Sequence, residues 1–244
     1  IFAFKKNEFD ITDQKKCHLL INQIQPDLLI NCGAYTNVDK AENEIEKAQL
    51  INSYAPLFLA EEMNIINGRM IQISTDYVFN GSNRDIPYKP YSKRDPIGAY
   101  GKSKVLGEKA IEKVFKDTQK GLILRTSWLM GPIGNNFALT MLKLHSTKES
   151  ISVVSDQTGS PTCTQTLAKA CWRISFLMKN NFNFVEGKTP ILHWSDEGIA
   201  SWFDISLAIG EIGKEIGLLS KSAKLKSISS LEYPTEAKDL NIQF

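Results

Sequence analysis

The chain has 244 residues, of which 42% are hydrophobic and 23% are charged, the proportions of an ordinary globular protein long enough to bury a core. Its formal net charge is only +2 and no basic stripe is present, which argues against a nucleic-acid partner. No apolar stretch approaches the ~20 residues that cross a bilayer, so we expect no membrane association.

Short apolar runs alternate with helical periodicities along the first half of the chain. Runs without polar alternation predict buried strands at 1–4, 28–30, 70–73 and 122–124. Helical spacing predicts helices at 13–24, 38–63 and 100–115, and a loop rich in Pro, Gly and Asp is expected over 81–98. After residue 128 the alternation weakens, with helices expected at 136–144, 164–178 and 201–216. This order predicts an α/β protein with a Rossmann-like, doubly wound parallel sheet, whose ligands bind at the carboxyl ends of the strands.

Tyr100 and Lys104 open the helix predicted at 100–115 and lie four residues apart on one face. A ketone that accepts hydride needs a proton on its oxygen, which a tyrosine hydroxyl can donate. The ordinary tyrosine pKa of ~10 is high for this task, and we expect the Lys104 ammonium to lower it. The same ammonium can hold the ribose hydroxyls of a nicotinamide cofactor. Among seven tyrosines in a lysine-rich chain, roughly one such spacing arises by chance, so a half-packed surface tyrosine is the alternative.

A hydroxyl-rich segment, Ser74-Thr75-Asp76-Tyr77, ends the strand predicted at 70–73. A hydroxyl at this point can bond the substrate oxygen that Tyr100 protonates. The alternative is a common strand-ending turn. The ordered combination of strand, hydroxyl, Pro-rich loop and Tyr-x-x-x-Lys helix favours the catalytic interpretation.

Several longer segments follow one another in a specific order and spacing. They are INCGAYTNVDKAE (30–42), ISTDYVFNG (73–81), YGKSKVLGE (100–108), LRTSWLMG (124–131), NNFALTMLKL (135–144), VVSDQTGSPT (153–162) and GIASWFDISLAIGE (198–211). Over about residues 1–235 the chain resembles the dTDP-4-dehydrorhamnose reductase family of extended short-chain dehydrogenases/reductases. The resemblance implies hydride transfer from NADPH, or NADH, to the C4 ketone of dTDP-4-dehydro-L-rhamnose, giving dTDP-L-rhamnose.

The resemblance also implies a role for each matching residue. Tyr100 would donate the proton, Lys104 would assist it and clamp the cofactor, and Thr75 would hold the ketone oxygen. Asp76 and Trp128 would contact the sugar, a core tryptophan being the alternative for Trp128. The further residues implied to bind the cofactor are Asp10, Ile11, Gly33, Ala34 and Tyr35. Residues 156–162 would lie on the nucleotide side of the pocket.

Two domains are expected on the same basis. Residues 1–130 would form the dinucleotide-binding Rossmann domain, lacking the family's first strand and Gly-x-x-Gly-x-x-Gly turn, and we expect roughly 30 residues to precede Ile1 in the intact protein. Residues 131–244 would form mainly a smaller C-terminal substrate-binding lobe, with some segments returning to the Rossmann domain. Further departures from the family pattern occur at 89–91 and 233–238.

The cofactor preference is expected from Lys5 and Lys6, which stand where NAD-selective enzymes often carry a carboxylate. A basic pair suits the extra phosphate of NADPH, although exposed lysines are usually just solvated surface. The four cysteines form no CxxC pair and are not grouped with the three histidines, so we expect no metal site and a cytoplasmic location. Mg²⁺ dependence is left open.

The expected partner is the dTDP-sugar substrate, and the protein is expected to be a monomer or a homodimer. Two other functions are consistent with the pattern. One is a non-catalytic NADP-binding module resembling the regulatory subunit of methionine adenosyltransferase. The other is a reductase or epimerase for a different sugar nucleotide. The complete set of Thr75, Tyr100 and Lys104 favours an enzyme.

Overall fold

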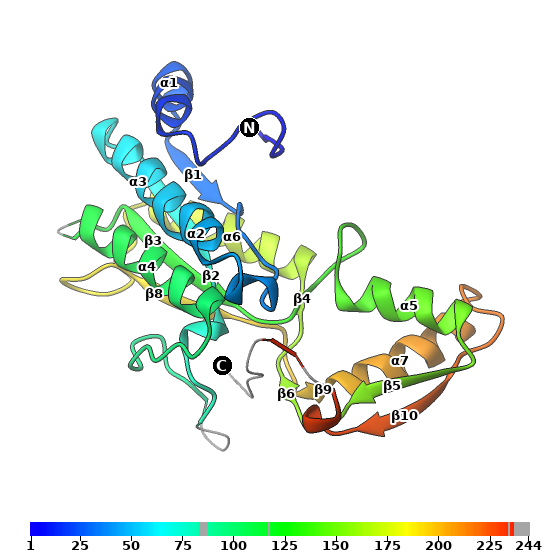
Figure 1. The fold of residues 1–244 in the computed structure, drawn as a ribbon. Helices are drawn as coiled ribbons and strands as arrows, with labels where there is room; N and C mark the ends of the chain where they lie inside the picture. The colour runs from blue at the N-terminus through cyan, green and yellow to red at the C-terminus, as the bar shows by residue number, and fades with distance from the viewer. Residues whose placement is uncertain (83–86, 117, 234, 237–244) are drawn as a thin grey trace.

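The computed structural model describes residues 1–82, 87–116, 118–233 and 235–236. Parts of the loop 81–98 and of the tail 233–238 therefore lie outside the described residues. The larger lobe is built on a central sheet, and a smaller lobe projects from its carboxyl-end side (Figure 1).

Four parallel strands form the central sheet, in the order β1-β2-β3-β8. Their bounds are β1 (Leu28–Asn31), β2 (Arg69–Thr75), β3 (Gly121–Thr126) and β8 (Ile191–Trp194). Every residue of β3 is buried, because helices cover both faces of the sheet. The predicted α/β class with a doubly wound parallel sheet is confirmed.

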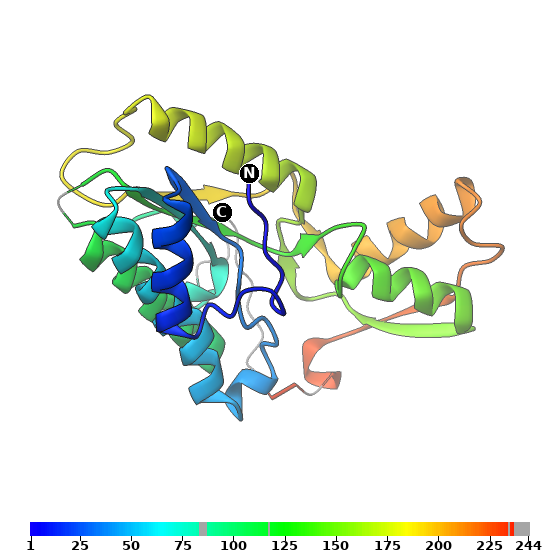
Figure 2. The same ribbon diagram turned by 90° about the horizontal axis from the view of Figure 1, so that it is seen from above.

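Helices lie on both faces of this sheet. One face carries α1 (Gln14–Ile24), α3 (Ala55–Ile65) and α4 (Ala99–Val114), and the other carries α6 (Thr164–Lys179) (Figure 2). Successive strand residues point to opposite layers: Ile123 packs in the first, while Leu122 and Leu124 pack in the second against Leu167 and Ile174 of α6. The uninterrupted apolar runs in the sequence reflect this double coverage.

The smaller lobe is formed mostly by the second half of the chain (Figure 1). Its main elements are α5 (Phe137–Thr147), β5 (Ser150–Val154), α7 (Trp202–Glu215) and β10 (Lys224–Ile228), with β5 and β10 paired in parallel. Short strand pairs connect it to the sheet: β4 (Leu129–Met130) with β7 (Thr162–Cys163), and β6 (Thr158–Gly159) with β9 (Ala200–Ser201). Side-chain caps begin both helices, from Asn136 on α5 and from the Ser201–Asp204 capping box on α7.

The predicted strand at 1–4 is wrong. These residues form no strand, Ile1 and Phe2 are exposed, and Phe4 packs only edge-on against Phe9. An apolar run becomes a strand only where its backbone N–H and C=O groups pair with a neighbouring strand. Among the described residues, β1 pairs only with β2, and the run at 1–4 does not join the sheet. The following turn is closed by Glu8, whose carboxylate accepts the backbone N–H of Lys5.

The predicted helix at 38–63 is divided into several pieces. They are η1 (Lys40–Glu42), α2 (Ile45–Gln49), the π-helical turn η2 (Leu50–Tyr54) and α3. The π turn carries Asn52, whose buried amide bonds to neighbouring segments. Strands β5, β8 and β10 were not predicted, and the other predicted helices match α1, α4, α5, α6 and α7 within a few residues.

Candidate active site

Three segments meet at the carboxyl edge of the sheet. The chain leaves β1 through residues 32–35, leaves β2 through Thr75 and the 3₁₀ turn η3 (Asp76–Val78), and enters α4 at Ala99. Parallel strands β1 and β2 are neighbours and α4 contacts η3, so residues far apart in sequence gather here. The edge predicted to carry the ligand site therefore brings the two catalytic motifs together.

The end of β1 is shaped by side-chain bonds to the backbone. Asn31 accepts the N–H of Gly33 at 3.0 Å and donates to Gln72 of β2 at 2.9 Å. A Cβ at Gly33 would lie 2.7 Å from Cδ1 of Ile11, so the 10–11 segment rests directly on the glycine. The predicted cofactor residues Asp10, Ile11 and Gly33 are thus neighbours, with the Asp10 carboxylate exposed.

Tyr35 is fixed more tightly than the sequence indicates. Its backbone N–H donates to Asn52 and its carbonyl accepts from the same amide, at 2.9 and 3.0 Å. Its phenol donates to Glu44 at 2.9 Å. Asn52 also donates to Ser103 of α4, which in turn donates to the Tyr100 carbonyl. The loop after β1 is therefore held against the helix that carries Tyr100.

Thr75 and Asp76 lie buried at the end of β2, with exposed fractions of 6% and 3%. The Thr75 hydroxyl donates to the Asp76 carboxylate at 2.9 Å. Burial raises the pKa of Asp76 to about 6, and the hydrogen bonds from Thr75 and the nearby backbone only partly offset this effect. An ionisable group of altered acidity therefore lies beside the reacting side chains.

Tyr100 lies in the first turn of α4 and is only 9% exposed. Its phenol lies close enough to the Thr75 hydroxyl to interact with it, and its ring packs edge-on against Tyr77 with ring centroids 5.4 Å apart. A Cβ at Gly101 would lie 2.2 Å from the Tyr77 carbonyl, so only glycine allows this approach of α4 to η3. The alternative of a half-packed surface tyrosine is excluded.

The prediction that Lys104 lowers the pKa of Tyr100 is wrong for the protein without its cofactor and substrate. Burial raises the pKa of Tyr100 to about 12; the neighbouring Thr75 hydroxyl acts to lower this pKa and the Asp76 charge acts to raise it. Lys104 itself is buried, and desolvation lowers its pKa to about 8, opposed by Glu108 and Cys32. Its ammonium donates to the Ile73 carbonyl at 2.8 Å. The spacing of two residues along a helix does not indicate how strongly burial will desolvate them.

Trp128 lies where β3 passes into the smaller lobe. Its backbone is in the left-handed region with φ of 45°, unusual for a bulky residue. Its ring stacks on Trp202 at 3.5 Å between centroids, and a Cβ at Gly159 would lie 2.6 Å from it. Gly159 belongs to the segment 156–162, whose Gln157 accepts a hydrogen bond from the Trp202 indole. The structure thus joins Trp128 to the 156–162 segment and to the start of α7.

Sequence reasoning missed several supporting residues. They are Asn31, Asn52, Ser103, Glu108, Arg125 and Trp202. A buried Glu and a buried Arg in apolar surroundings are a signal of an ion pair, but their pairing partner is not readable from one sequence. Of these residues, only Asn52 lies outside the motifs quoted above.

Comparison with known proteins gives concordant matches. The family model for the RmlD substrate binding domain matches residues 1–240. The dTDP-4-dehydrorhamnose reductase of Escherichia coli K12 is 37% identical over 218 residues, which are 89% of this chain and 70% of the relative. The chain belongs to the dTDP-4-dehydrorhamnose reductase family.

Other members of the dTDP-4-dehydrorhamnose reductase family and its relatives agree. The Bacillus subtilis spore coat polysaccharide biosynthesis protein SpsK is 42% identical, over 90% of this chain and 73% of its own length. The crystal structure of the Bacillus anthracis dTDP-4-dehydrorhamnose reductase in complex with NADP superposes with a TM-score of 0.87 at 32% identity, covering all of this chain and 80% of that one.

Two features are absent from the residues of this family member that the structure describes. None of its described helices has the length and apolarity that crossing a membrane requires. In the same part of the chain, no group of three His, Cys, Asp or Glu side chains is placed to hold a metal ion.

Proposed function

We propose that the protein reduces the C4 ketone of dTDP-4-dehydro-L-rhamnose with NADPH, giving dTDP-L-rhamnose. The observation that carries the proposal is that the Tyr100 phenol and the Thr75 hydroxyl lie close enough to interact, at the strand edge where Lys104 is buried one helical turn away. Membership of the dTDP-4-dehydrorhamnose reductase family supports the substrate class.

The residues at this edge fit a nicotinamide dinucleotide. The exposed Asp10 carboxylate and Ile11 lie beside Gly33, and the Lys104 ammonium is near enough to the exposed Cys32 to affect the pKa of its thiol. Bound NADPH supplies the hydride. Asp10, Ile11, Gly33, Ala34 and Tyr35 would line the cofactor, and Lys104 would donate hydrogen bonds to its ribose.

The protein side chains bind the ketone oxygen and donate a proton to it. The Thr75 hydroxyl donates to that oxygen, while Asp76 and Trp128 hold the sugar. Tyr100 donates its phenolic proton as negative charge develops on the oxygen. Because burial raises its pKa to about 12, Tyr100 carries that proton throughout the neutral range. With the cofactor and substrate bound, the Lys104 ammonium would stabilise the phenolate that remains.

The decisive experiment replaces Tyr100 by Phe. Turnover in an NADPH-oxidation assay with the dTDP-linked ketosugar should fall by ~10²-fold or more, while NADPH affinity stays unchanged. Tyr54→Phe, on the exposed side of η2, is the matched control and should turn over normally. Equal turnover of Tyr100→Phe and the native protein would refute the role of Tyr100. Tight NADPH binding with no turnover of any nucleotide-linked ketosugar would instead indicate a binding module.

A further inference from the structure

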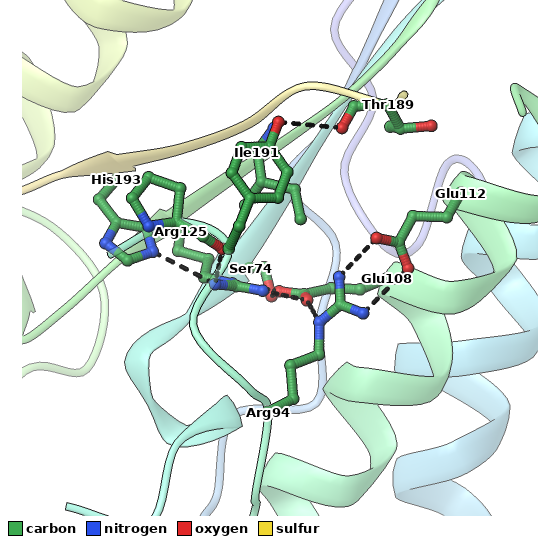
Figure 3. A network of polar contacts seen from close by, with 10 residues as sticks. Ser74, Arg94, Glu108, Glu112, Arg125, Thr189, Ile191 and His193 are labelled. Carbon is green, nitrogen blue, oxygen red and sulfur yellow. Dashed lines mark hydrogen bonds and ion pairs between the residues drawn. The ribbon is translucent and has the colours of Figure 1, made fainter. Parts of the chain in front are cut away.

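Glu108 is a fully buried carboxylate in the helix of Tyr100 and Lys104. It accepts the Ser74 hydroxyl at 2.6 Å and the Arg125 guanidinium through two bonds, at 2.8 and 2.7 Å. Arg94 Nε lies 2.6 Å from its second oxygen (Figure 3). The proposed reaction gives this carboxylate no role, although burying a charge costs free energy unless partners offset it.

Arg125, the main partner of Glu108, is held in a fixed position. The residue is completely buried in β3, directly beside Ser74 in the parallel register. Its guanidinium also donates to the Pro90 carbonyl at 2.9 Å and lies over the Phe79 ring at 5.0 Å. Glu108 therefore connects α4 to two adjacent strands whose relative position is set by the sheet.

Three consecutive residues of β2 contact α4. The Ile73 carbonyl accepts a hydrogen bond from Lys104, the Ser74 hydroxyl donates to Glu108, and the Thr75 hydroxyl lies close enough to the Tyr100 phenol to interact with it. The Glu108 contact belongs to the same strand end as the two contacts of the reacting residues. A shift of Glu108 would move the helix along β2 and change both of the other distances.

The charge of Glu108 also acts on Lys104. The two residues are four apart on α4, so they occupy adjacent turns of one face. Burial opposes ionisation of Glu108, but the Arg125 bonds, the charges of Arg125 and Arg94 and the Ser74 bond outweigh it and hold its pKa below the ordinary value. The resulting carboxylate raises the pKa of Lys104 and so opposes the lowering caused by desolvation. Cys32, which follows β1, also raises the pKa of Lys104.

We propose that Glu108 is the positioning residue of this site, which ties α4 to the end of β2 and serves as the buried counter-charge of Lys104. This role rests on the proposed reductase function, because Lys104 matters there as an ammonium. Without the carboxylate, Lys104 would lose its proton at lower pH and the enzyme would lose activity on the alkaline side.

The test compares Glu108→Gln with Glu112→Gln. Both positions lie on α4 and both carboxylates bind Arg94, but only Glu108 acts on Lys104. Lysines labelled with ¹³C at Cε are titrated by NMR, with Lys104→Met assigning the signal. Glu108→Gln should lower the Lys104 midpoint by about one pH unit, a tenfold change in the charged fraction, while Glu112→Gln leaves it unchanged. The alkaline limb of the kcat profile should move by the same amount. A Lys104 midpoint that is equal in both variants would overturn the proposal.

A second comparison leaves the Glu108 carboxylate in place, so that the guanidinium groups of Arg94 and Arg125 keep their partner. Ser74→Ala removes only the link between β2 and Glu108; Ser175→Ala removes a similar hydroxyl bond within α6 and is the control. Ser74→Ala should lower kcat about 10-fold, with an unchanged NADPH KM and an unchanged Lys104 midpoint. An unaffected kcat would refute the positioning role. The NMR titration needs no turnover, so it tests the counter-charge even if the proposed reaction is wrong.

Discussion

The Thr75 hydroxyl and the Tyr100 phenol lie close enough to interact across the contact between β2 and α4. Both side chains are more than 90% buried, so the pair is shielded from competing water. A ketone oxygen placed beside them would accept a hydrogen bond from each hydroxyl. The pair is therefore prearranged for one small acceptor atom.

Replacing Thr75 by Val should remove the donor without changing the shape of the side chain. We expect kcat/KM for the ketosugar to fall by roughly 10²-fold, as when one donor to a developing oxyanion is lost. Thr75→Ser retains the hydroxyl and should recover most of the activity. Thr140→Val, on the exposed side of α5, is the control for the substitution itself. A Thr75→Val variant as active as Thr75→Ser would contradict the role of this hydroxyl.

Asp76 should lower the stability of the fold at neutral pH. Its pKa is about 6 in the folded protein and close to the ordinary value of 3.8 when unfolded, so between these values the folded state holds more protons. The free energy of unfolding therefore falls as pH rises from about 4 to 6 and stays lower above that range. Asp76→Asn should raise it by about 1–3 kcal/mol at pH 7, with little change at pH 4.

Urea unfolding at both pH values measures this difference, and Asp204→Asn supplies a contrast of opposite sign. Hydrogen bonds from Ser201 lower the pKa of Asp204, so its contribution to stability is present at neutral pH and is lost as pH falls. Asp204→Asn should therefore destabilise the protein at pH 7. If Asp76→Asn also proved destabilising at pH 7, the buried carboxylate would not be under the expected desolvation.

Gly107 should be irreplaceable even by alanine. Within a helix, Gly→Ala normally stabilises by about 1 kcal/mol. A Cβ at Gly107 would lie 2.1 Å from the Asn52 carbonyl, where η2 packs against α4, so we expect Gly107→Ala to destabilise by about 1–3 kcal/mol. Gly213→Ala in α7 meets mainly the flexible Leu219 side chain and should cost less. The denaturant midpoints of the two variants measure the difference in stability. A loss of stability in Gly107→Ala that is equal to or smaller than that in Gly213→Ala would contradict the prediction.

Lys5 and Lys6 should select the phosphorylated cofactor. Both are exposed in the turn before Asp10, and Lys6 is close enough to lower the pKa of the Asp10 carboxyl. Exchanging both for Gln should raise the KM for NADPH about 3- to 10-fold, as expected for one or two exposed ion pairs, and leave the KM for NADH unchanged. Lys113→Gln/Lys116→Gln at the end of α4 is the control. Parallel changes for the two cofactors would rule out phosphate recognition by this pair.

Much of the architecture is written in local sequence patterns. The apolar runs at 28–30, 70–73 and 122–124 became β1, β2 and β3, because strands covered on both faces need no polar alternation. The spacing of Tyr100 and Lys104 and the hydroxyl at Thr75 were readable for the same reason. They lie at the start of a helix and the end of a strand, whose positions local patterns indicate.

Other features depend on which segments pack together. The run at 1–4 is as apolar as β1 but has no partner strand among the described residues, whereas β8 joins the sheet from 65 residues beyond β3. Asn52 binds Tyr35 across 17 residues, and Glu108 binds Ser74 across 34. Periodicity reports the neighbours along the chain, and these partners are neighbours only in space.

The acidity of the reacting groups shows the same division. Helical periodicity is enough to predict that a phenol and an ammonium lie one turn apart. Burial in the folded chain raises the pKa of Tyr100 and lowers that of Lys104, with Asp76 and Glu108 as the nearby charges, and no local pattern predicts this. The free energy of ionising a group depends on its solvation and on all charges around it, and both are set when the chain folds.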